Sequence, residues 1–211
     1  EHSDQRLLGA PPGYVGYDAG GELTNAVKAH PFSILLFDEI EKAHPSILDK
    51  FLQILDDGRM TDSKGETVYF TETIIIFTSN KGIYSTQPDG TKIPLVGQND
   101  NYETIERKVK EAVQDYFISE LGRPEILNRI GNNLVVFDFI RPDSVPAILQ
   151  KQVHNILIGL QETRGIVLKL ESDSKAWEKL VNLSVQNLSF GGRGIGNVVE
   201  KYLLNPLART I

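Results

Sequence analysis

Two short runs of apolar residues stand out along a chain of otherwise mixed polarity. Ile34-Leu35-Leu36-Phe37 and Ile74-Ile75-Ile76-Phe77 each contain no polar residue. Uninterrupted runs of this length, rich in branched and aromatic side chains, are typical of strands in a parallel sheet that is covered on both faces. We therefore predict two buried strands here, and a third strand at 134–137.

Elsewhere, apolar residues recur at the three- and four-residue spacing of amphipathic helices. This spacing predicts helices over 23–29, 40–55 with a break at Pro45, 102–121, 124–129, 143–160 and about 174–183, and a last helix from 191. Turn-forming residues predict a loop over 1–22, a hairpin over 59–70 and a long surface loop over 81–101, and 166–170 is expected to be a short strand. We interpret His44 as a polar residue at the helix break rather than a metal ligand, because no second ligand lies at a suitable spacing.

The pattern changes character near residue 140. Before this point strands alternate with helices, which is typical of an α/β domain, and after it helices dominate. We predict an α/β domain over 1–140 and a small, mostly α-helical domain over 141–211.

The composition excludes several classes of protein. The 211 residues carry a net charge of −6 and include no cysteine, so a disulfide framework and a thiolate metal site are excluded. Lys and Arg form no dense block, and no apolar run approaches the ~20 residues of a membrane span. We expect a cytoplasmic protein without a nucleic-acid or membrane partner. The chain begins at Glu1 and its one methionine is Met60, so we expect it to be part of a longer polypeptide.

Two acids directly follow the first apolar run. Asp38 and Glu39 would lie at the carboxyl end of a strand, where open α/β sheets bind their ligands. In nucleotide-hydrolysing sheets, one such acid holds Mg²⁺ and the next can polarise a water molecule. The alternative is a strand that enters a solvated helix start, where acids are also favoured.

Two further stretches carry candidate chemistry. The second strand ends in Thr78, Ser79 and Asn80, and the Asn80 amide could place a water or a phosphate oxygen, or simply form a turn. The glycine- and proline-rich loop displays Tyr14 and Tyr17, which could grip a partner or pack back onto the core.

Together these stretches resemble the second ATPase ring of the Clp/Hsp100 unfoldases, within the AAA+ class. The motifs, in family order, are Gly9-Ala-Pro-Pro-Gly-Tyr-Val-Gly-Tyr17, the Walker B element ending in Asp38-Glu39, Thr78-Ser-Asn80, Arg123-Pro-Glu-Ile-Leu-Asn-Arg-Ile130 and Gly191-Gly-Arg193. The resemblance covers nearly the whole chain and implies a P-loop AAA+ large domain followed by a helical lid domain.

The resemblance also implies roles for individual residues. Asp38 would hold Mg²⁺, while Glu39 and Asn80 would place the attacking water near the γ-phosphate of ATP. Arg129 would act as an arginine finger toward a neighbouring subunit of a homo-oligomeric ring, expected to be a hexamer, and Arg193 would sense the nucleotide. Tyr14, with Val15 beside it, would press on an unfolded or aggregated polypeptide that is threaded through the pore. For Arg123 we expect an intrachain salt bridge.

Three departures from the family pattern keep alternatives open. The Gly-x-x-x-x-Gly-Lys-Ser/Thr phosphate loop is missing from the sequence, so the 211 residues alone are expected to be inactive and to lack the central strand of the sheet. In Leu95-Val96-Gly97-Gln98, polar Gln98 replaces the apolar residue that docks on a protease ring, which makes such a partner doubtful. Gly192 stands where the family commonly has Ala, and Gly131 stands where it usually has Asp; both are milder departures. The rivals to a disaggregase are a protease-coupled subunit and a non-catalytic oligomerisation module.

Overall fold

The computed structural model describes residues 5, 7–87 and 89–210. They form two compact units, one extending to Val136 and the other beginning at Phe137. Along the described chain, no helix is both long enough and apolar enough to cross a membrane.

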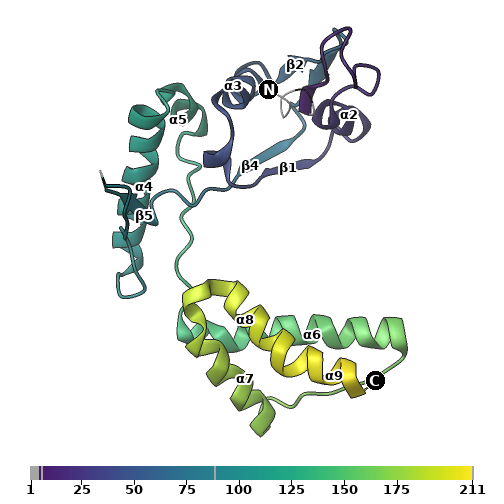
Figure 1. The fold of residues 1–211 in the computed structure, drawn as a ribbon, viewed down its shortest axis with the longest axis vertical. Coiled ribbons are helices and arrows are strands. Elements are labelled where there is room, and N and C mark those ends of the chain that lie inside the picture. The colour runs from purple at the N-terminus through teal and green to yellow at the C-terminus, as the bar shows by residue number, and fades with distance from the viewer. Residues whose placement is uncertain (1–4, 6, 88, 211) are drawn as a thin grey trace. The chain divides into compact units, whose positions relative to one another are not determined.

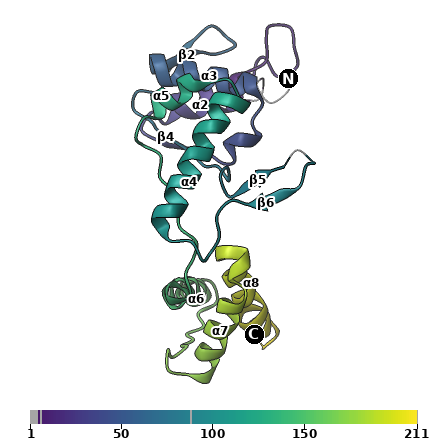
Figure 2. The same ribbon diagram turned by 90° about the vertical axis from the view of Figure 1, so that its left-hand side faces the viewer.

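The first unit combines short strands with helices (Figures 1 and 2). Its elements are α2 (Glu22–Ala29), β1 (Ile34–Phe37), η1 (Ile40–Lys42), α3 (Pro45–Asp57), β2 (Arg59–Thr61), β3 (Thr67–Tyr69), β4 (Ile74–Phe77), β5 (Tyr84–Thr86), β6 (Lys92–Pro94), α4 (Tyr102–Asp115), η2 (Tyr116–Glu120) and α5 (Pro124–Ile130). The two predicted apolar strands are confirmed as β1 and β4.

β1 and β4 pair in parallel and form the sheet that positions the site (Figure 1). Their register places Ile34 opposite Ile74 and Phe37 opposite Phe77. One face of the pair packs on α3, where the ring centroid of Phe51 lies 4.4 Å from that of Phe37 and 5.2 Å from that of Phe77. This aromatic cluster fixes both strand ends against one helix.

The prediction that β1 and β4 are buried on both faces is wrong for this chain. Ile34, Leu36 and Ile74 are more than 60% exposed, and Ile76 is 43% exposed. Side chains alternate across a strand, so these four residues share one face. We call them the aliphatic face. The described residues place no element over it, whereas α3 covers the opposite face.

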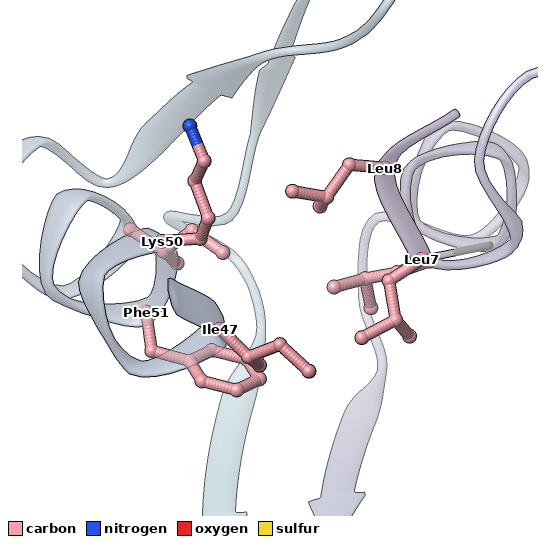
Figure 3. Close-up of a pocket in the computed structure, with 7 residues that line it drawn as sticks. Leu7, Leu8, Ile47, Lys50 and Phe51 are labelled. Carbon is pink, nitrogen blue, oxygen red and sulfur yellow. The ribbon is translucent and has the colours of Figure 1, made fainter. Parts of the chain in front are cut away.

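α3 begins where the sequence pattern breaks. The His44 side chain accepts a hydrogen bond from the backbone N–H of Ser46, and Pro45 occupies the first turn. His44 is therefore a helix cap, as its interpretation as a polar break residue required. α3 also borders an apolar recess in which Ile47 and Phe51 face Leu7 and Leu8 (Figure 3). A second apolar recess lies between α3, η2 and α5.

Two hairpins extend from this unit. The predicted hairpin over 59–70 is confirmed as β2 paired with β3. The long loop predicted over 81–101 is not irregular, because β5 and β6 pair within it. Lys108 of α4 donates a hydrogen bond to the carbonyl of Leu95, which ties the end of this second hairpin to α4. α4 continues through the π-helical turn η2, so the predicted helix over 102–121 is confirmed.

The second unit is helical. Its elements are η3 (Pro142–Ser144), α6 (Val145–Arg164), α7 (Lys175–Gln186), η4 (Leu188–Phe190), α8 (Gly191–Val199), η5 (Glu200–Leu204) and α9 (Asn205–Thr210). Its core consists of Val145, Leu149, Val153, Leu180, Leu188, Ile195, Val198 and Val199. Gly165 ends α6 in a left-handed conformation, and the Ser174 side chain caps α7 by accepting a hydrogen bond from the N–H of Trp177.

Two predicted strands do not form. Residues 134–137 and 166–170 have no strand pairing in the structure. Val135 and Phe137 are 75% and 87% exposed, whereas Val136 between them is buried at 8%. An extended segment becomes a strand only when a neighbour accepts its backbone hydrogen bonds, and the described residues offer no such neighbour at either place.

Candidate functional site

The parallel pairing of β1 with β4 places Asp38 and Glu39, which follow β1, beside the polar residues that follow β4. The N–H of Thr78 donates to the carbonyl of Phe37 at 2.9 Å, and the N–H of Ile40 donates to the carbonyl of Thr78 at 3.0 Å. Asp38 and Glu39 are therefore held beside Thr78. The Thr78 hydroxyl donates to Oδ1 of Asp38 and accepts from the N–H of Glu39 at 3.1 Å.

Glu39 has an unusual backbone. With φ 55° and ψ 54°, it is the one non-glycine residue with positive φ in the part of the chain that the structure describes. For a residue with a Cβ, the left-handed conformation costs about 1–2 kcal/mol and persists only where the surroundings impose it. Such strain is concentrated at functional sites, and here it turns the chain sharply from β1 into η1.

The amide of Asn80 reaches the carboxylate of Glu39. Asn80 Nδ2 lies 3.4 Å from Glu39 Oε1, a long hydrogen bond between two groups predicted to act on the same water. The other carboxylate oxygen of Glu39 accepts from Lys42 Nζ at 2.7 Å. This hydrogen bond, together with the charge of Glu39, raises the pKa of the Lys42 ammonium group. Glu39 and Asn80 are therefore close enough to work together.

Glu41 supports Asn80 from the other side. Its Oε1 accepts from the backbone N–H of Asn80 at 3.2 Å, while its buried Oε2 has no hydrogen-bond partner among the described atoms. The hydroxyl of Tyr116 approaches the carbonyl of Glu41 at 3.4 Å. Burial is the main reason why the pKa of Tyr116 is raised, and the charges of Glu120 and Glu41 add to the shift. The site is thus connected to the end of α4.

The donor set fits a magnesium ion that is held mainly by phosphate and water. Within residues 5, 7–87 and 89–210, no three acidic, histidine or cysteine side chains are arranged to hold a metal ion by themselves. Mg²⁺ at nucleotide sites usually takes one or two carboxylates together with phosphate oxygens and waters. Asp38 is exposed and oriented by Thr78, so one of its oxygens can serve in this way.

The loop that carries Tyr14 and Val15 projects into solvent. Tyr14 is 64% exposed and Val15 is fully exposed, whereas Tyr17 is partly buried. The base of the loop is held by Lys64, which donates to the carbonyl of Asp18 at 2.7 Å. Tyr14 therefore does not pack back onto the core, and its ring is available for contact.

The two arginines near α5 are both paired within the chain. Arg123 donates to Asp49, with 2.8 Å between Nε and Oδ1, so the expected intrachain salt bridge is confirmed. This pairing raises the pKa of Arg123 and lowers that of Asp49. Arg129 forms an ion pair with Asp56. The Arg129 and Asp56 side chains are both partly exposed. Ion pairs of this kind contribute only about 0–1 kcal/mol to stability, so Arg129 can leave Asp56 at little cost.

Arg193 lies in the first turn of α8, in the second unit, and its side chain is exposed. Asp38, Glu39 and Asn80 belong to the first unit. Gly192 beside Arg193 is not demanded by space, because an added Cβ would meet only a side-chain atom of Ile140 at 3.6 Å.

The segment Leu95-Val96-Gly97-Gln98 is partly buried rather than displayed. Val96 is 4% exposed. Backbone hydrogen bonds from Leu95 to the carbonyl of Ile83 and from Gly97 to the Asp100 carboxylate hold the segment in place. These contacts favour an ordinary surface turn over a docking loop.

Sequence reasoning missed three residues at this site. It assigned no role to Thr78, Glu41 or Lys42, although each touches a predicted site residue. The signal for Thr78 was present, because Asp38 and Thr78 each follow an apolar run of four residues. Parallel pairing of the two runs places these positions side by side.

The sequence matches one family model and several known proteins. Residues 1–132 match the family model of the AAA domain, Cdc48 subfamily. The chaperone protein ClpB of Agrobacterium fabrum is 42% identical over 212 residues, which covers 100% of this chain and 22% of that protein. The chloroplastic ClpB2 of Oryza sativa is 41% identical and covers 100% of this chain and 20% of that protein. The chain thus spans about a fifth of these relatives.

A solved structure has the same fold over nearly the whole of this chain. The Saccharomyces cerevisiae Hsp104–casein complex in its extended conformation matches with a TM-score of 0.79 at 34% identity, covering 98% of this chain and 33% of that chain. This match confirms the predicted fold class, an α/β AAA+ domain followed by a helical lid. The motif-bearing strands, the family model and these relatives together show that the chain belongs to the AAA domain family and, within it, to the Clp/Hsp100 group.

Proposed function

We propose that residues 1–211 supply the catalytic acids, the pore loop and the lid of an ATP-driven protein unfoldase or disaggregase. They would belong to its second ATPase ring, and the phosphate loop would lie outside this stretch. The observation that carries the proposal is the convergence of Asp38, Glu39 and Asn80 at the paired ends of β1 and β4. Phosphoryl transfer depends on positioning and charge rather than covalent chemistry, so this convergence is what catalysis needs from the protein.

Each group at the strand ends has a distinct task. ATP would supply the transferable phosphoryl group, and bound Mg²⁺ would supply the positive charge that neutralises it. Asp38 offers an oriented carboxylate oxygen to the metal, and the Glu39 carboxylate accepts a hydrogen bond from the attacking water. Asn80, within 3.4 Å of Glu39, holds the same water from a second direction. Lys42 restricts the Glu39 side chain through its hydrogen bond at 2.7 Å.

Two arginines would complete the site from elsewhere. Arg129 would leave Asp56 and reach the nucleotide of a neighbouring subunit in a hexameric ring, which would make hydrolysis depend on assembly. Arg193 would approach the nucleotide from the helical lid, with domain boundaries near 1–140 and 141–211. An arginine that neutralises transition-state charge in trans typically accelerates hydrolysis by about 10³–10⁵-fold.

Tyr14 and Val15 would contact the translocated polypeptide. The high exposure of both side chains supports this role, as does the casein bound to Hsp104 in the solved complex. A protease ring is a weaker candidate partner, because Val96 of the segment around Gln98 is buried. We place the protein in the cytoplasm.

The test is ATP turnover by the longer polypeptide that carries these residues, with and without casein. We expect the wild-type protein to hydrolyse ATP and casein to stimulate it, while Glu39→Gln binds ATP without turnover. Glu111→Gln, which alters an exposed acid on α4, is the matched control and should behave as wild type. If the wild-type protein shows no turnover and Glu39→Gln changes nothing, the chain is an interaction module instead.

A further inference from the structure

The Thr78 hydroxyl is used in both of its hydrogen-bonding roles, and both partners are predicted catalytic residues. It donates to Oδ1 of Asp38 and accepts from the N–H of Glu39. A carboxylate can only accept and a backbone N–H can only donate, so the direction of the hydroxyl proton is determined by its partners. One oxygen atom therefore joins the side chain of one acid to the backbone of the next.

The surrounding backbone holds this hydroxyl in place. Thr78 also donates its N–H to Phe37 and accepts from Ile40, both across the strand pair. These four hydrogen bonds connect Thr78 to four consecutive residues, 37–40. Threonine is β-branched and restricted about χ1, so its hydroxyl cannot turn away without breaking two of these contacts.

The arrangement addresses two separate difficulties of the site. Asp38 is exposed, and an exposed carboxylate is free to rotate unless a donor engages one of its oxygens. Glu39 sits in a strained left-handed conformation that requires support from neighbouring groups. The Thr78 hydroxyl orients the first residue and supports the second.

We propose that Thr78 is a positioning residue for the acid pair: its hydroxyl orients the Asp38 carboxylate toward Mg²⁺ and holds the backbone of Glu39. The inference rests on the ATPase function proposed above. Hydrogen-bond partners that orient a metal-binding side chain typically change metal affinity by about 10- to 100-fold when they are removed. Thr78 would act through Asp38 and Glu39 without touching the nucleotide.

The test compares Thr78→Val, which keeps the shape but removes the hydroxyl, with Thr78→Ser, which keeps the hydroxyl. The first readout is the Mg²⁺ dependence of fluorescent ATP-analogue binding by the longer polypeptide, in a Glu39→Gln background that prevents turnover. We expect Thr78→Val to raise the half-saturating Mg²⁺ concentration about tenfold or more, and Thr78→Ser to stay within about threefold. Thr73→Val is the matched control, because its hydroxyl donates to the Phe70 carbonyl at the other end of β4.

The second readout is amide hydrogen exchange over residues 38–40, which needs neither nucleotide nor activity. Thr78→Val should speed exchange of the Glu39 amide, whereas Thr78→Ser and Thr73→Val should not. The proposal is overturned if Thr78→Val leaves both readouts unchanged, or if Thr78→Ser or Thr73→Val causes the same loss, since packing would then be the cause. If the parent protein neither binds nor hydrolyses ATP, the proposed function fails, and unchanged exchange in Thr78→Val would separately remove the positioning contact.

Discussion

Replacing Glu39 with glycine should make the chain more stable than replacing it with alanine. Alanine keeps the positive φ that Glu39 shows, and a left-handed residue with a Cβ costs about 1–2 kcal/mol. Glycine adopts this conformation freely, although it loses about 0.5–1 kcal/mol more backbone entropy on folding than alanine. At the mid-values of the two ranges, relief of strain outweighs the entropy term, so we expect the free energy of unfolding of Glu39→Gly to exceed that of Glu39→Ala by about 0.75 kcal/mol.

The comparison removes other effects, because both variants lose the Lys42 contact and the carboxylate alike. The assay is urea or thermal unfolding of the 211-residue chain, where this difference corresponds to about 1–4 °C in midpoint. The control is the same pair of substitutions at Glu111 within α4, because a glycine inside a regular helix makes a protein less stable than an alanine does, by about 1 kcal/mol. The sign should therefore reverse between the two positions. If Glu39→Gly is the less stable variant, as at Glu111, the backbone of Glu39 is not strained and its conformation does not mark the site.

Three further predictions concern other parts of the first unit. Burial alone would raise the pKa of Asp62, but hydrogen bonds from Lys28 and two backbone amides outweigh it and lower that pKa. The stability that Asp62 supplies is therefore complete above the ordinary carboxyl pKa of about 3.9 and is lost as pH falls through the lower pKa of the folded state. We expect Asp62→Asn to be less stable than the wild-type chain at pH 7. In urea unfolding at a series of pH values, the variant should also lose less stability than the wild type as the pH is lowered. Tyr14→Ala should stop threading of a fluorescent model substrate while basal ATP turnover by the parent polypeptide persists; equal loss of both would argue against a pore-loop role. Arg129→Ala should reduce turnover at least about 10³-fold whereas Arg123→Ala retains it, and comparable turnover in the two variants would remove the arginine-finger assignment.

The periodicity of the sequence predicted most of the helices and the parallel strand pair, because those elements bury one face or one run of apolar residues. It did not predict β5 and β6, which contain polar residues and little apolar surface. Their signal lies in the turn, where the Asp89 carboxylate accepts from the N–H of Thr91 and Gly90 adopts positive φ. An Asp-Gly pair between short extended segments is a strong hairpin signal.

The candidate site was predictable in part for a related reason. Asp38, Glu39 and Asn80 follow apolar runs, so their location at strand ends could be read from the sequence. Which side chains touch depends on strand register and on turns such as the left-handed Glu39. Thr78 could have been found from the register alone, but the contact of Glu41 with Asn80 required the path of η1.

The aliphatic face formed by Ile34, Leu36, Ile74 and Ile76 has a consequence for handling the chain in solution. Stacking two copies over this face would remove four large aliphatic side chains per copy from water, and contiguous apolar surface of this kind promotes self-association. The net charge of −6 opposes that association by keeping copies apart. Salt screens charge repulsion but does not weaken apolar contact. The purified chain should therefore stay dispersed in dilute buffer and gather into larger particles as ionic strength rises, a trend that light scattering can follow.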